Sequence, residues 1–242
     1  FTVPERMKGK RLFISFQGAE SGLALWLNGE FVGYAEDSFT PSEFELTDYV
    51  KDGENKLAAQ VFKWTSASWC EDQDFFRFSG IYRDVYLYTV PDIHVRDMKI
   101  SACPDEELKN GALEIRLGMM AAENARGSAR FQLVGDGKVI SEEVLALEKE
   151  TVWSCTVENP ALWSAEEPNL YDLTVEIFDA DGNLQEIIPE KVGFRRFEMK
   201  NRVMTLNGKR IVFKGVNRHE FSSVSGRAVT EAELRKDLEV MK

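Results

Sequence analysis

Residues 71–74 combine side chains that could bind a polar ligand. They read Glu-Asp-Gln-Asp and lie between Trp69 and the pair Phe75 and Phe76. Carboxylate oxygens are the ligands that hard cations of low charge prefer. Aromatic rings beside acidic groups suit a sugar, which has an apolar face and a polar rim. A generic acidic quartet is more often a solvated turn, so the quartet alone does not define a site.

A second candidate segment is residues 217–220, Asn-Arg-His-Glu, which follows an apolar run at 210–216. The imidazole of His219 offers one donor and one acceptor to a sugar hydroxyl. A histidine in this position could equally satisfy a neighbour at the end of a strand. The only other histidine is His94, so the chain cannot build a site of several histidines.

The composition narrows the classes of partner. The 242 residues include 41 acidic and 30 basic side chains, for a formal net charge of −11. This balance argues against nucleic acid or an anionic membrane, both of which need a basic footprint. No apolar run approaches the length of a membrane span, and the N-terminus does not resemble a secretory signal. Cys70, Cys103 and Cys155 lack metal-ligand spacing and are interpreted as reduced thiols of a cytoplasmic protein.

Short alternating runs predict a mainly β chain in which turns position the candidate residues. The first set of expected strands covers residues 12–16, 23–27, 30–34, 57–64 and 85–88, with an Asn-Gly hairpin turn at 28–29. A seam near Pro91 precedes a second set at residues 93–100, 112–117, 129–134, 151–157 and 170–178. That second set fits an immunoglobulin-like β-sandwich.

The last segment has a different pattern. It predicts a hairpin, a strand at 210–216, a polar loop at 217–229 and a helix that begins at Thr230. Thr230 and Glu233 form a capping-box pattern, and Leu234, Leu238 and Met241 make one apolar stripe. Strand, loop and helix together indicate the first unit of a β/α repeat.

The motifs resemble those of the large β-galactosidases of glycoside hydrolase family two. The resemblance is carried by residues 26–34, 37–47, 71–85, 159–164, 168–171, 193–195 and 206–220. It implies the later part of a jelly-roll sugar-binding domain at residues 1–91, an immunoglobulin-like β-sandwich at 92–196 and the start of a TIM-barrel catalytic domain at 197–242. The family's jelly-roll normally begins before the match to Phe1, so the chain is expected to be a section of a larger enzyme.

The resemblance also implies an activity, and it implies which functional residues lie inside and outside this chain. The parent would be a retaining glycoside hydrolase of carbohydrate metabolism that acts on terminal β-D-galactosyl residues of lactose-type substrates, and the large members form homo-oligomers. Its two catalytic glutamates lie on later strands, and most ligands of its magnesium ion lie beyond Lys242. No catalytic residue is therefore assigned in this chain, and the isolated chain is expected to be inactive. His219 matches a residue that contacts the galactosyl hydroxyls. Asp74 matches a ligand of a sodium ion that also touches the sugar.

Two alternatives stay open: a non-catalytic carbohydrate-binding module, and a section of a sibling β-glucuronidase or β-mannosidase. Several other side chains are given structural roles. Trp26 and Trp64 are expected in the core, Trp163 in packing at the sandwich, and His94 at the domain seam. Arg77, Arg83 and Asp84 are expected to form ion pairs that hold Asp74, and the role of Arg218 is left open.

Overall fold

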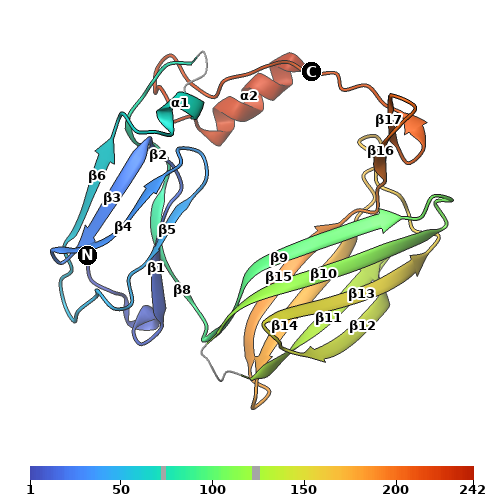
Figure 1. Ribbon diagram of the computed structural model, residues 1–242, viewed down its shortest axis with the longest axis horizontal. Coiled ribbons are helices and arrows are strands. Elements are labelled where there is room, and N and C mark those ends of the chain that lie inside the picture. Colours follow the sequence, from blue (N-terminus) through green and yellow to red (C-terminus); the bar gives the residue numbers. More distant parts are fainter. Residues whose placement is uncertain (72–74, 122–125) are drawn as a thin grey trace. The chain divides into compact units, whose positions relative to one another are not determined.

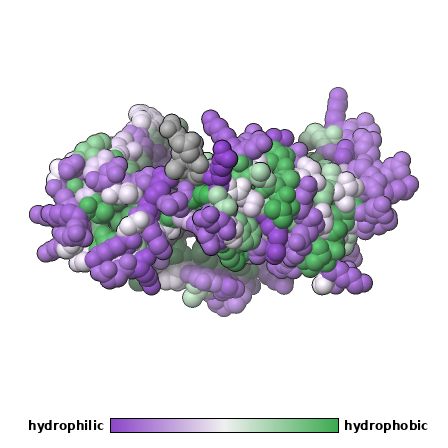
Figure 2. Space-filling view, turned by 90° about the horizontal axis from the view of Figure 1, so that it is seen from below, coloured by the Kyte–Doolittle hydropathy of each residue, from purple (hydrophilic) through white to green (hydrophobic). Residues whose placement is uncertain are grey.

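The computed structural model describes residues 1–71, 75–121 and 126–242 (Figure 1). The chain is mainly β and divides into two compact units, residues 1–90 with 216–242, and residues 91–215. No helix within the described residues has the length and apolar character needed to cross a membrane. Hydrophilic side chains cover much of the face shown in Figure 2, as expected from 71 charged residues, the sum of 41 acidic and 30 basic ones.

The first unit is built from short antiparallel strands. Its strands are β1 (Arg11–Phe16), β2 (Ala19–Glu20), β3 (Gly22–Leu27), β4 (Glu30–Glu36), β5 (Ser42–Glu45), β6 (Leu57–Phe62), β7 (Gly80–Ile81) and β8 (Val85–Val90). They form sheets with the orders β5-β1-β8, β4-β3-β6 and β2-β7. The unit also contains the short helices η1 (Glu5–Met7) and α1 (Ser68–Glu71), and the helix α2 (Glu231–Met241).

Alternating apolar side chains explain why the sheets of the first unit pack together. Leu12, Ile14 and Phe16 of β1 share one buried cluster with Leu23, Leu25 and Leu27 of β3. Successive side chains of a strand point to opposite faces, so these spacings place three side chains of each strand on the inner face. The β3–β4 hairpin turns at Asn28 and Gly29, whose φ angles of 55° and 92° are those that an Asn-Gly turn tolerates. The predicted hairpin is confirmed.

The second unit contains an immunoglobulin-like sandwich. Its strands are β9 (Ile93–Pro104), β10 (Asn110–Ala121), β11 (Gly127–Gly135), β12 (Lys138–Ala146), β13 (Glu150–Glu158), β14 (Tyr171–Asp179) and β15 (Leu184–Val192). A three-stranded sheet, β13-β10-β9, packs on a four-stranded sheet, β12-β11-β14-β15. Between them Trp153 of β13 stacks on Phe131 of β11 with ring centroids 5.1 Å apart. The predicted sandwich is therefore confirmed, with β12 and β15 added to the expected strands.

His94 has the structural role predicted for it, now with a named partner. Its Nδ1 lies 3.0 Å from Oε1 of Glu186, and the Val95 N–H donates to the same carboxylate at 3.0 Å. These contacts join β9 to β15 inside the second unit.

The stability of the second unit is therefore expected to fall in acid. Burial raises the pKa of the Glu186 carboxyl, but the hydrogen bonds from His94 and Val95 outweigh it and leave that pKa below its usual 4.5. A carboxyl with a lowered folded pKa stabilises the fold above its unfolded pKa, and this contribution is lost as the pH falls through the folded value. Thermal unfolding between roughly pH 6 and pH 3 checks this. Glu186→Gln is expected to flatten the decline, and an equally steep decline in that variant would contradict it.

The C-terminal segment departs from the sequence prediction in one element. A small sheet, β16 (Phe197–Lys200), β17 (Val203–Leu206) and β18 (Lys209–Arg210), ends at the first residue of the strand predicted at 210–216, and residues 211–216 form no strand. A buried parallel strand needs neighbours on both sides, and the described residues supply none there. Val212, Phe213 and Val216 are 63%, 72% and 70% exposed. The prediction of α2 is confirmed, because Thr230 and Glu233 form both bonds of the capping box.

Candidate functional site

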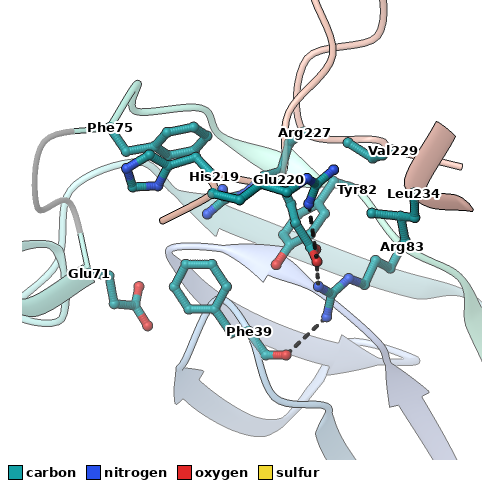
Figure 3. Close-up of a pocket in the computed structure, with 11 residues that line it drawn as sticks. Phe39, Glu71, Phe75, Tyr82, Arg83, His219, Glu220, Arg227, Val229 and Leu234 are labelled. Carbon is teal, nitrogen blue, oxygen red and sulfur yellow. Dashed lines mark hydrogen bonds and ion pairs between the residues drawn. The ribbon is translucent and has the colours of Figure 1, made fainter. Parts of the chain in front are cut away.

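A pocket of about 510 Å³ lies in the first unit, where the segment after residue 216 meets the strands and loops of residues 1–90 (Figure 3). Phe39, Glu71, Phe75, Tyr82 and Arg83 line it from the earlier part of the chain. The later part contributes Arg218, His219, Glu220, Arg227, Val229 and Leu234. Its wall thus combines aromatic rings with charged groups of both signs, a lining that suits a polar ligand with apolar faces.

His219 lies at the edge of this pocket. Its imidazole stacks on the ring of Phe75, with centroids 4.7 Å apart and the ring planes 20° from parallel. Asp74, the predicted sodium ligand, lies outside the described residues, whereas Phe75 directly follows it in the sequence. Phe75, the residue that follows the acidic quartet, therefore lies in the same pocket as the predicted sugar-contact histidine.

Further aromatic side chains surround Phe75. Phe78, Phe76 and Phe221 lie with ring centroids 5.8, 6.2 and 5.4 Å from that of Phe75, in tilted or edge-on orientations. Such arrangements stabilise beyond the area they bury, because the positive edge of one ring meets the negative face of another. We call Phe75, Phe76, Phe78 and Phe221 the aromatic cluster. It joins the segment after residue 74 to the loop that carries His219.

A buried ion pair lies next to the aromatic cluster. Nε of Arg227 and Oε2 of Glu20 are 3.3 Å apart, and the two side chains are 9% and 8% exposed. Oε1 of Glu20 accepts a hydrogen bond from the Phe78 N–H at 3.2 Å. Burial raises the pKa of the neighbouring Tyr82 phenol, which therefore stays neutral and donates to the Ser38 carbonyl.

The polar rim of the pocket is a chain of ion pairs. Arg83 lies 3.9 Å from Glu220 and also donates to the Phe39 carbonyl at 2.9 Å. The other oxygen of Glu220 is 3.8 Å from Arg218, whose Nε donates to Asp237 of α2 at 3.0 Å. Arg218, whose role the sequence left open, therefore links the loop after residue 216 to α2.

Of the ion pairs expected around residues 77–84, that of Arg83 takes a different form. Arg83 pairs with Glu220 of the later segment, and within the described residues it forms no pair with Asp84. The guanidinium of Arg77 lies 3.5 Å from the ring centroid of Trp64, on its face. The predicted core position of Trp64 is wrong, because this residue is 70% exposed and a planar guanidinium covers its ring instead of apolar neighbours.

For the other two tryptophans, Trp26 and Trp163, the structure is closer to the prediction. Trp26 is half-buried against Phe31, with ring centroids 5.5 Å apart. Trp163 packs within the second unit, where the Arg195 guanidinium lies 4.8 Å from its ring centroid and the backbone of Gly193 approaches the ring closely. The packing role predicted for Trp163 is confirmed.

The described residues do not by themselves make a metal site. Residues 1–71, 75–121 and 126–242 contain no group of three His, Cys, Asp or Glu side chains arranged around one position. Both oxygens of Glu71 accept hydrogen bonds from Ser38, at 3.0 Å from its N–H and 2.6 Å from its hydroxyl. That carboxylate fixes the loop after β4.

Sequence reasoning missed Phe39, Tyr82 and Arg227 as parts of this pocket, and Glu20 as the ion-pair partner of Arg227. Glu20 stands among small and polar residues between two predicted strands, and Arg227 stands in a polar loop, so neither has a local pattern that marks it.

Comparisons with known proteins identify the family. The model of the glycosyl hydrolases family 2 sugar binding domain matches residues 1–91, the family 2 model matches 93–195, and the model of the family's TIM barrel domain matches 197–242. A β-galactosidase of Halalkalibacterium halodurans is 51% identical over the whole chain, and one of Clostridium acetobutylicum is 48% identical. The chain covers 24% and 27% of these relatives, about a quarter of their length.

Solved structures agree on the fold. A β-glucuronidase from Bacteroides uniformis superimposes with a TM-score of 0.85 at 26% identity, and one from Parabacteroides merdae with 0.87 at 21%. Both comparisons cover the whole of this chain, and 31% and 32% of the solved ones. With three consecutive models of one family matched in order, the chain belongs to glycosyl hydrolases family 2.

Proposed function

We propose that this chain is a section of a retaining β-galactosidase that hydrolyses terminal β-D-galactosyl residues. The observation that carries the proposal is the 51% and 48% identity to β-galactosidases across the full chain. The β-glucuronidases are 26% and 21% identical to this chain, about half the identity of the β-galactosidases. A glucuronidase also needs a basic group for the uronate, and Arg83, Arg218 and Arg227 of this pocket are all engaged with carboxylates.

The proposal assigns bond cleavage to residues outside this chain. Hydrolysis with retention needs two carboxyl groups about 5–5.5 Å apart, one as nucleophile and one as acid and base. Of the two carboxylates that line the pocket among the described residues, Glu220 is shared between Arg83 and Arg218, and Glu71 is bonded to Ser38. Each of these two carboxylates is thus held by structural partners. The chain then supplies scaffold and part of the galactose site.

His219 is the substrate-binding residue of the proposal. Its imidazole is exposed at the pocket and held against Phe75, so its ring nitrogens can donate to and accept from sugar hydroxyls. Asp74, as the resemblance implies, is proposed as an oxygen ligand of a sodium ion at the same pocket. The stacking of Phe75 on His219 supports placing both there. Magnesium ligands are assigned to the rest of the enzyme.

The proposal keeps the domain division at residues 1–91, 92–196 and 197–242, in an enzyme expected to be cytoplasmic and homo-oligomeric. The end of the first domain is supported by the change of compact unit at residues 90–91. The hairpin after residue 196 stays with the second unit, because Asn207 accepts from the Arg196 N–H and donates to the Trp163 carbonyl.

A direct assay tests this function. The full-length enzyme is expected to hydrolyse a nitrophenyl β-galactoside far faster than the matching β-glucuronide or β-mannoside, and the 242-residue chain is expected to hydrolyse none of them. Preference for the glucuronide or mannoside would overturn the proposed substrate. Turnover by the purified chain, free of host enzyme, would overturn the assignment of catalysis elsewhere. A full-length protein that binds galactose without hydrolysing any glycoside would favour the carbohydrate-binding alternative.

A further inference from the structure

The loop at 217–229 contains one arginine whose burial the proposed chemistry does not explain. The Arg227 side chain is 9% exposed, although the loop around it is largely exposed and Val224 reaches 94%. Its only ion-pair partner among the described residues is Glu20 at the end of β2, also nearly buried. Apart from this ion pair, neither Nε of Arg227 nor Oε2 of Glu20 has a hydrogen-bond partner within the described part of the chain. Both charged groups are thus buried, and each is the other's ion-pair partner.

Aromatic rings complete the surroundings of the guanidinium. Its central carbon lies 4.7 Å from the ring centroid of Phe39, 4.6 Å from that of Phe75 and 5.5 Å from that of Tyr82. Ring faces attract a cation, and more strongly when water is excluded. The three rings come from three places in the first ninety residues, so Arg227 fixes the end of its loop against the jelly-roll strands.

Phe75 connects this arrangement to the proposed sugar contact. The same ring contacts the Arg227 guanidinium and stacks on the His219 imidazole at 4.7 Å. The loop between the two residues is itself closed, because Ser222 and Gly226 exchange backbone hydrogen bonds of 2.8 and 2.9 Å. Gly226 has a φ of +63° and packs on Phe78 of the aromatic cluster. Figure 3 shows Phe75, His219 and Arg227 grouped on one side of the pocket.

We propose that Arg227, anchored by Glu20, is a positioning residue that holds Phe75 and the loop at 217–229 so that the His219 imidazole faces the pocket. The proposal deepens the proposed function, since it rests on His219 as the sugar contact for its consequence in catalysis. The positioning itself is a property of this chain, and it can be measured without any substrate.

The two histidines of the chain provide a direct probe. With only histidine isotopically labelled, the spectrum of the 242-residue chain has two imidazole signals, and His94 in the second unit is an internal reference. Stacking on Phe75 is expected to move the His219 ring protons upfield through the ring current. Arg227→Met is expected to move the His219 signal toward the position of an unstructured histidine and to leave the His94 signal unchanged. Arg227→Lys, which keeps the charge, is expected to restore much of the upfield shift.

The matched control is Arg235→Met, which removes an arginine that is 73% exposed and paired with Glu231 on α2. It is expected to leave both signals in place. Methyl signals of Leu25 and Leu27, fully buried in the first unit, report whether each variant is folded. If Arg227→Met unfolds this unit, the nearly isosteric Glu20→Gln decides, and it is expected to shift the His219 signal in the same direction. A His219 signal unmoved in a folded Arg227→Met variant, or in Glu20→Gln, would overturn the positioning role.

The catalytic consequence is measured separately in the full-length enzyme. Arg227→Met is expected to lower kcat/KM for a β-galactoside by about 100-fold, the order of loss produced by a small misplacement of a binding group. In a His219→Ala background the same change is expected to cost little, because the residue acts through His219. An equal loss in both backgrounds would contradict the route through His219. If the His219 signal shifts while His219→Ala leaves kcat/KM unchanged, the proposed sugar contact fails and the positioning role stands.

Discussion

In the full-length enzyme, His219→Ala is expected to lower kcat/KM for a β-galactoside by about 100- to 1,000-fold, the range for removing one hydrogen-bonding group that acts on the transition state. The imidazole is exposed at the pocket, so its removal leaves no core cavity and the fold is expected to persist. Because a contact that tightens as the sugar distorts stabilises the transition state more than the bound substrate, most of the loss is expected in kcat.

The natural control for this experiment is the other histidine. His94→Gln removes an imidazole bonded to Glu186 in the second unit, and it is expected to lower the stability of that unit without changing kcat/KM. A second comparison, His219→Gln, restores one donor and one acceptor and is expected to recover part of the activity. The sugar-contact role is contradicted if His219→Ala matches the unmodified enzyme in kcat and KM.

The strands of this chain were largely predictable because their signals are local. In β3, Leu23, Leu25 and Leu27 alternate along six residues, and an Asn-Gly pair follows directly. Strands β12 and β15 were missed because they lie at the edges of their sheet, where apolar side chains such as Val139 and Ile187 are exposed and the alternation is weak. The strand predicted at 210–216 failed for a different reason, since no strand of the described residues pairs with residues 211–216 and the apolar side chains Val212, Phe213 and Val216 are exposed.

The site was only half predictable for a related reason. His219 stands in a recognisable motif, but its setting depends on side chains from distant parts of the chain. Residue type alone makes Arg227 a solvated charge in a polar loop, and only the fold shows that Glu20 and three aromatic rings enclose it. A buried ion pair of this kind depends on residues far apart in the sequence, because burying either charge without the other is unfavourable.

Because Arg227 and Glu20 depend on each other, changing either one is also expected to have a large effect on stability. Arg227→Met leaves Glu20 buried with one hydrogen bond, from the Phe78 N–H, and is expected to lower the unfolding free energy of the first unit by about 3–5 kcal/mol. Glu20→Met leaves a buried guanidinium that keeps its contacts with Phe39, Phe75 and Tyr82, so its cost is expected at the lower end of about 3–5 kcal/mol.

The double variant Glu20→Met, Arg227→Met is expected to be more stable than Arg227→Met alone, because it removes the uncompensated charge and fills the space with apolar atoms. Hydrogen exchange in β1 and β3 measures the first unit, and exchange in β11 of the second unit gives the internal control. Strictly additive losses would show that the two side chains do not interact across the 3.3 Å between them. A double variant that regains stability yet leaves the His219 signal displaced would separate the two consequences of the pair. Its charges would then contribute orientation to the pocket more than stability to the fold.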